Sequence, residues 1–262
     1  MKKLTLKMKQ SISQIYSEGS VEKIGKSTLS ALQRRGVVNV NNKLTNFGTR
    51  CAILQMPLIK QCAELSIDYK EMSLQYLGKP EDALLSHYQS LGFIGVSTEG
   101  IGILTILKAL MLDELSKYNI LGRADACSRY LEAQFVINSN AIENIISSIP
   151  LTSREKFISN FNEITSESFI AYTHPELSLE FAIAIYDALD ANSFILIANK
   201  LSENPYKYGN GWPDLTLIKG NDVLFIEVKV RDKLHESQIF TIPEIQKIIP
   251  AGFCVCKLSK VS

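Results

Sequence analysis

The sequence predicts an α/β fold with a large helical portion, a C-terminal pair of strands and a small separate module at the N-terminus. The first observation is the run 223–226, in which every residue is apolar. A strand that is buried on both faces has this pattern, because neither face needs polar residues. The second is the helical apolar pattern that fills most of 81–200. The third is a polar hairpin among short helices before residue 57. At 262 residues the chain can form one large or two smaller domains.

The N-terminal module is expected over residues 1–57 and begins with two helical elements. Leu4, Ile12 and Ile15 suit one face of an amphipathic helix. Residues 21–24 are expected to form a short second element.

A third helix is predicted over 29–35, with Ser27-Thr28 as its cap and Gly36 as its end. Residues 37–40 and 43–45 then pair as a two-stranded wing. With the run STLSALQRRGVVNVNNKLTNFGTRCAI, this plan resembles the winged helix-turn-helix family. The resemblance implies that the third helix enters the major groove of DNA and that the wing touches phosphate. The implied DNA-binding residues are Ser27, Thr28, Ser30, Gln33, Arg34 and Lys43.

Charge favours a nucleic-acid partner for this module but not for the chain as a whole. The 28 Lys and Arg residues nearly balance the 27 Asp and Glu residues, so any DNA contact must come from a local patch. Only Glu18 and Glu22 oppose the basic residues before residue 51. These basic residues are Lys2, Lys3, Lys7, Lys9, Lys23, Lys26, Arg34, Arg35, Lys43 and Arg50. A winged module used for protein contacts is the alternative.

The five cysteines show no paired framework, and Cys254 and Cys256 alternate on one strand face as packing residues do. An odd cysteine count without a signal peptide favours an intracellular protein that is not secreted, in the cytoplasm or, in a eukaryote, the nucleus. The longest apolar runs are too short to cross a bilayer, so no membrane partner is expected.

Beyond the module, residues 58–80 are expected to form a linker or helical connector of mixed helix and loop. The main domain then spans residues 81–262, with a helical insertion over about 116–192. After a hairpin, it ends with a helix over 236–249 and a strand over 253–258.

Polar side chains gather at one end of the predicted C-terminal hairpin. Asp214 opens its first strand and Glu227-Val228-Lys229 ends its second. Because side chains alternate along a strand, Glu227 and Lys229 share one face and Val228 takes the other. Two carboxylates and an ammonium are costly to bury together unless they hold a hard metal ion and a charged substrate. This arrangement is typical of a PD-(D/E)xK restriction-endonuclease-like nuclease core, whereas a solvated hairpin edge is the alternative.

The segment from Gly209 to Leu258 resembles the virus-type replication-repair nuclease (VRR-NUC) family. The matching residues are Gly211-Trp212-Pro213-Asp214-Leu215, Glu227-Val228-Lys229, Asp232-Lys233-Leu234 and Gln238. Upstream, residues 87–115 are similar to the segment that carries the helical metal-binding glutamate in Fanconi-associated nucleases. That branch of the family cuts flap-like and cross-linked DNA, and its glutamate matches Glu99.

The resemblance implies that Asp214 and Glu227 bind one or two Mg²⁺ or Mn²⁺ ions. The Val228 carbonyl would be a further ligand, and Glu99 would complete the carboxylate set. Lys229 would orient or deprotonate the attacking water.

Two further assignments concern residues outside the hairpin. Gln238 would hold the attacking water, Lys229 or the backbone phosphate. For the third acid, a structural role for Glu99 at the start of an apolar helix stays open, because the helix dipole favours acids there. Glu176, Glu180 and Asp187 are its alternatives.

The sequence therefore predicts a metal-dependent, structure-selective DNA nuclease that hydrolyses phosphodiester bonds at flaps, branches or nicks in DNA repair. A Holliday-junction or restriction-type nuclease acting as a dimer is the nearest alternative. The other is a non-catalytic winged-helix DNA-binding protein on a decayed nuclease scaffold.

Overall fold

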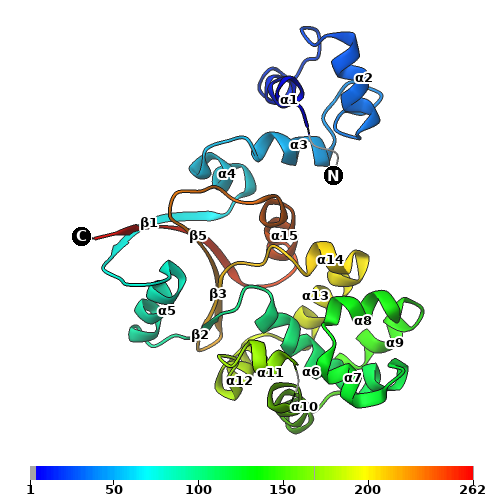
Figure 1. Ribbon diagram of the computed structural model, residues 1–262, viewed down its shortest axis with the longest axis vertical. Coiled ribbons are helices and arrows are strands. Elements are labelled where there is room, and N and C mark those ends of the chain that lie inside the picture. Colours follow the sequence, from blue (N-terminus) through cyan, green and yellow to red (C-terminus); the bar gives the residue numbers. More distant parts are fainter. Residues whose placement is uncertain (1–3, 168, 262) are drawn as a thin grey trace.

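The computed structural model describes residues 4–167 and 169–261 and has a mixed α/β fold built around a five-stranded sheet (Figure 1). The strands lie in the order β1-β5-β4-β3-β2. They are β1 (Asp68–Leu74), β2 (Ile94–Ser97), β3 (Leu215–Lys219), β4 (Asp222–Lys229) and β5 (Gly252–Lys260). Lys2 and Lys3 of the basic patch lie outside the described residues.

Four helices precede or lead into the sheet: α1 (Leu6–Glu18), α2 (Lys26–Arg34), α3 (Asn46–Ile53) and α4 (Leu58–Leu65). Helix α5 (Pro80–Ser90) lies between β1 and β2, and α15 (Glu236–Gln246) lies between β4 and β5. The remaining helices form the large helical portion: α6 (Ile101–Tyr118), α7 (Gly122–Ser128), α8 (Leu131–Ile137), α9 (Ile142–Ser147), α10 (Arg154–Glu167), α11 (Phe169–Thr173), α12 (Leu179–Ala188), α13 (Ala191–Glu203) and α14 (Pro205–Tyr208).

The β3–β4 hairpin forms as the sequence predicts. Its turn is tight, because Lys219 pairs with Asp222 and Gly220, with φ of 61°, supplies the left-handed backbone that such a turn needs. Strand β4 has β3 antiparallel on one side and β5 parallel on the other. A strand flanked and covered in this way is buried on both faces, which explains the continuous apolar run.

Different helices pack on the two faces of the sheet. On one face, Leu84 of α5 packs with Ile226 and Val228 of β4. On the other, Phe225 of β4 shares an apolar cluster with Ile239 of α15. Because side chains alternate, the polar residues that follow Phe225 on its face of β4 point toward α15.

Among the described residues, no single helix is both long and apolar enough to cross a bilayer. Helices α12 and α13 meet that test only together, and they are bent by 102°.

Helices α1, α2 and α3 pack around a core of their own, which includes Ile12, Leu32 and Val37. Gly36, with φ of 68°, ends α2 as predicted. Residues 21–24 lie in a turn, so the expected short second element does not form a helix. The expected pairing of the wing is present as an antiparallel bridge between Val38 and Leu44, flanked by backbone hydrogen bonds from Asn39 to Lys43 and from Thr45 to Val37. The winged-helix identity of this module stays a prediction.

The expected helical connector, residues 58–80, is wrong in part, because it contains β1 as well as α4. Strand β1 pairs in parallel with β5 along its whole length, so this segment belongs to the sheet. It is an edge strand of mixed polar and apolar residues, and such a strand has little local signal. The short strand β2 escapes prediction for a similar reason, since it lies in a glycine-rich stretch.

Arg50 of α3 joins the N-terminal module to α15. Pro243 lies inside α15 and has no N–H for the carbonyl of Ile239. The Arg50 guanidinium donates to that carbonyl at 2.9 Å and to the carbonyl of Phe240 at 2.7 Å, and it forms an ion pair with Glu244. One side chain from the module thus meets two carbonyls and one carboxylate of the same helix, although Lys247 also contacts Glu244.

We expect Arg50→Met to lower the free energy of unfolding by about 2 kcal/mol, because it leaves partly buried acceptors without a charged donor. Urea denaturation measures this change. Arg34→Met, at an exposed position of α2, is the matched control and should change it little. Equal effects of the two variants would show that the Arg50 contacts are unimportant.

Candidate active site

Asp214 lies directly before β3 and is held against β4. Its Oδ2 accepts the backbone N–H of Val228 at 2.7 Å. The approach to Asp214 passes Gly211, whose φ is 80° and where a Cβ would lie 2.4 Å from backbone atoms of Ser237. Only glycine fits this contact, which presses the Asp214 loop onto the start of α15.

Glu227 and Lys229 share one face of β4, as their spacing predicts, and both are buried, at 1% and 4% exposure. The Lys229 Nζ lies 2.8 Å from Glu227 Oε1 and 3.4 Å from Asp232 Oδ2. Gln238 Nε2 donates to the same Glu227 oxygen at 2.6 Å. Two donors therefore converge on one oxygen of Glu227.

Gln238 is positioned by the beginning of its own helix. Its Oε1 accepts the backbone N–H of His235 at 2.8 Å, as the third residue of a capping box. The amide nitrogen is thereby turned toward Glu227. The same cap that starts α15 thus aims Gln238 into the site.

The acids of this site hold their protons more tightly than usual. Burial, followed by the charge of Asp214, raises the pKa of Glu227 to about 8. Burial also raises the pKa of Asp214, and the carboxylate of Glu81 in α5 adds to that rise. The site therefore favours positive charge beside its two carboxyl groups.

The donor set fits a hard divalent ion. Glu227 Oε2 is buried and, within the described residues, receives no hydrogen bond. Such an oxygen is costly unless a proton or a cation meets it, and oxygen ligands are what Mg²⁺ and Mn²⁺ prefer. Across residues 4–167 and 169–261, however, no three His, Cys, Asp or Glu side chains gather closely enough to hold an ion.

Glu99 is near the site by its backbone. Its N–H donates to the carbonyl oxygen of Asp214 at 3.3 Å, and its φ of 48° is left-handed, which is uncommon for a residue with a side chain. The adjacent Gly100 lies under Trp212, since a Cβ there would be 2.8 Å from the indole ring. The start of α6 and the Asp214 loop are therefore locked together.

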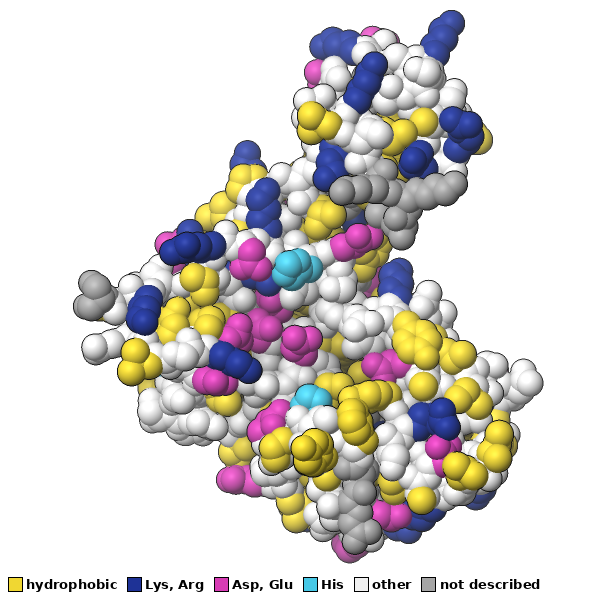
Figure 2. Space-filling model, viewed as in Figure 1, with side chains coloured by type: hydrophobic (Ala, Val, Ile, Leu, Met, Phe, Trp, Pro, Cys, Tyr) yellow, Lys and Arg dark blue, Asp and Glu magenta, His cyan; other side chains and the backbone are white. Residues whose placement is uncertain are grey.

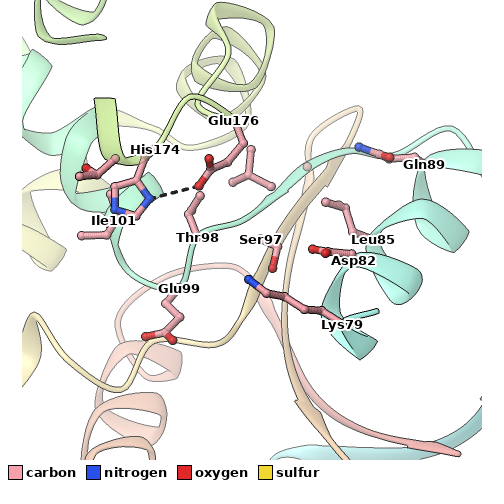
Figure 3. A pocket seen from close by; sticks show the side chains of 13 residues that line it. Lys79, Asp82, Leu85, Gln89, Ser97, Thr98, Glu99, Ile101, His174 and Glu176 are labelled. Carbon is pink, nitrogen blue, oxygen red and sulfur yellow. Dashed lines mark hydrogen bonds and ion pairs between the residues drawn. The ribbon is translucent and has the colours of Figure 1, made fainter. Parts of the chain in front are cut away.

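The Glu99 side chain is exposed and lines a cleft of about 710 Å³. In Figure 3 its carboxylate points away from the hydrogen-bonded His174–Glu176 pair at the other end of this cleft. Of the alternative acids, Asp187 forms a surface ion pair with Arg154. The role of Glu99 as a metal ligand stays a prediction.

Substitutions at Glu99 can distinguish the effect of its left-handed backbone on stability from the effect of its carboxylate on catalysis. Glu99→Gly and Glu99→Ala both remove the carboxylate, but only glycine adopts the left-handed backbone without strain, so we expect it to be more stable than alanine by about 1 kcal/mol. If the carboxylate takes part in catalysis, both variants and Glu99→Gln lose activity equally. Thermal unfolding and a cleavage assay check the two parts. Full activity in all three variants would remove Glu99 from the site.

The DNA-binding candidates of the N-terminal module divide into two groups. Ser27, Arg34 and Lys43 are exposed. Thr28 is only 7% exposed, because it faces the module core, and this disagrees with a DNA contact. Gln33 donates to Asn42 in the hairpin and so braces α2. In Figure 2, Lys and Arg side chains dominate this lobe, whereas acidic side chains gather near the middle of the same face.

Gln61 is a supporting residue that the sequence did not reveal. It is fully buried, accepts the N–H of Leu234 at 2.9 Å and donates to the carbonyl of Ile53 at 3.2 Å. It thus fixes the loop between β4 and α15 from the α4 side. No local pattern marks it, because its partner lies far along the chain.

No protein-family model and no curated protein matches the chain. Among solved structures, the fold is similar to that of paFAN1 bound to 5′-flap DNA. The TM-scores are 0.57 at 14% identity, for a complex with a 2-nt flap and gap, and 0.55 at 16% identity, for one with a 1-nt flap and gap. Each match covers 97% of this chain and 49% of paFAN1, so the chain spans about half the length of that protein.

Proposed function

We propose that the protein is a metal-dependent DNA nuclease that cuts flap or branched DNA. The observation that carries this proposal is the group formed by the half-buried Asp214 and the buried Glu227 and Lys229, with an oxygen of Glu227 left without a donor. The fold of paFAN1, which was captured on 5′-flap DNA, supports the choice of substrate. A role in DNA repair stays a prediction.

Asp214 and Glu227 would hold Mg²⁺ or Mn²⁺, with the Val228 carbonyl and Glu99 as further ligands. When bound, the ion supplies positive charge that offsets the charge developing on the phosphate and favours loss of a proton from water. The N–H of Val228 keeps the Asp214 carboxylate in place, and Gln238 does the same for Glu227.

Lys229 acts as a charged donor in this proposal. Burial alone would lower its pKa, but attraction to Glu227 more than compensates and raises the pKa above its usual value. An ammonium at this position can donate to the attacking water or to a phosphate oxygen.

The test is a cleavage assay on labelled 5′-flap, 3′-flap, nicked, four-way and single-stranded DNA. We expect cuts near the flap junction with Mg²⁺ or Mn²⁺, none with a chelator, and a loss on the order of 10²-fold in Lys229→Met. A preference for four-way junctions by a dimer would favour the junction or restriction-type alternative. Binding without cleavage of any substrate would contradict a nuclease and favour a DNA-binding protein.

A further inference from the structure

A second cleft lies beside the candidate active site, where the N-terminal module meets α14 and α15. It has a volume of about 620 Å³. Phe47 of α3 and Phe240 of α15 form one wall, with ring centroids 6.0 Å apart. Tyr206, Lys207, Asn210 and Ser237 complete most of its lining. We call it the Tyr206 cleft.

Tyr206 is an aromatic ring without a structural role. It is 57% exposed, and within the described residues its ring stacks on no other ring and its hydroxyl has no hydrogen bond. Its backbone is nevertheless held, because its carbonyl accepts the Asn210 side chain at 2.5 Å and Asn204 caps the helix that carries it. A large flat ring is therefore presented to solvent from a fixed position.

Lys207 supplies a positive charge at the same place. Its Nζ lies 5.0 Å from the ring centre of Phe240 and 4.8 Å from that of Tyr208. Within the part of the chain that the structure describes, no carboxylate forms an ion pair with it. The cleft thus combines an aromatic platform with a cation, the two features with which proteins bind single-stranded nucleic acids, although the carboxylate of Glu236 also lines it.

Two chain segments carry both lining residues of the cleft and residues of the candidate active site. Asn210 lies shortly before Asp214, and Ser237 directly precedes Gln238. Both segments are pressed together where Gly211 meets Ser237. The lining of the cleft and the candidate active site are therefore held together by the same backbone contact.

We infer that the Tyr206 cleft binds an unpaired nucleotide of the DNA substrate. The base lies against the Tyr206 ring and the Phe47–Phe240 wall, and its phosphate meets Lys207. The nucleotide must be unpaired, because the faces of a paired base are covered by its neighbours in the duplex. Asn210, Ser237 and the carboxylate of Glu236 offer hydrogen bonds to the base edge. This inference rests on the proposed function and specifies its substrate.

The experiment measures binding apart from cleavage, in the Asp214→Asn background without divalent metal. The probes are a 5′-flap duplex with 2-aminopurine in the unpaired strand beside the junction and a fully paired duplex of the same length. We expect quenching of the flap probe, and an affinity for the flap that falls about tenfold in Tyr206→Leu but is kept in Tyr206→Phe. Affinity for the paired duplex should not change.

Tyr172→Leu is the matched control, since Tyr172 is 87% exposed and does not line the cleft. An unchanged flap affinity in Tyr206→Leu overturns the inference, and so does an equal loss on the paired duplex. The nuclease proposal is tested separately. If the wild-type chain quenches the probe but never cuts DNA, nucleotide binding in the cleft is supported and nuclease activity is contradicted.

Discussion

Asp214→Asn is expected to reduce flap cleavage by about 10³-fold while leaving the affinity for flap DNA nearly unchanged. The amide keeps the shape of the side chain and can still accept the N–H of Val228. It removes one of the negative charges that would hold the divalent ion, and the ion supplies several kcal/mol of charge stabilisation in such reactions. Single-turnover cleavage and a binding titration measure the two quantities.

The matched control is Asp222→Asn, at an exposed position at the turn end of the same hairpin. It should leave the cleavage rate unchanged. A similar loss in both variants would point to the net charge of the hairpin as the cause. Wild-type activity in Asp214→Asn would contradict the assigned site.

Metal binding is expected to strengthen as pH rises to about 8. Burial and the charge of Asp214 hold the pKa of Glu227 at about 8, so below that pH an ion must displace a proton from this carboxyl. The apparent affinity for Mn²⁺ should therefore fall about tenfold for each pH unit below this value. Calorimetric titrations in two buffers of different ionisation enthalpy measure both the affinity and the released proton. Affinity that does not depend on pH would contradict a buried protonated ligand.

The same carboxyl predicts how the metal-free protein responds to pH. Its pKa is about 8 when folded and 4.5 as an unperturbed group, so between these values the folded state holds a proton that the unfolded chain has lost. Its contribution to stability is therefore full below 4.5 and is lost as pH rises toward about 8. Urea denaturation with a chelator should show this decline. Glu227→Gln, which cannot titrate, should reduce it.

The β3–β4 hairpin could be predicted because its determinants are local. The tight turn at Gly220 and the apolar run of β4 fix the register, and strand alternation then places Glu227 beside Lys229. The start of α15 could be predicted for the same reason, because Gln238 takes part in the capping box of its own helix. In each case the partners lie within a short stretch of chain.

The remaining features depend on residues that are distant in sequence. Strand β1 is defined only by its pairing with β5. Arg50 and Gln61 contact the α15 region, which is far from them in the sequence, and no pattern around them indicates their partners. The side-chain direction of Glu99 likewise depends on how the start of α6 packs on Trp212. Sequence patterns report periodicity and caps, whereas these contacts arise from tertiary packing.

The position of β5 between β1 and β4 affects when the sheet can form. While a ribosome is still translating the chain before residue 260, β1 has no partner and one edge of β4 is open. The nascent protein would then expose a half-built apolar sheet, which is a target for chaperones and a risk for aggregation. A newly made chain should therefore cut no DNA until this segment has emerged and inserted.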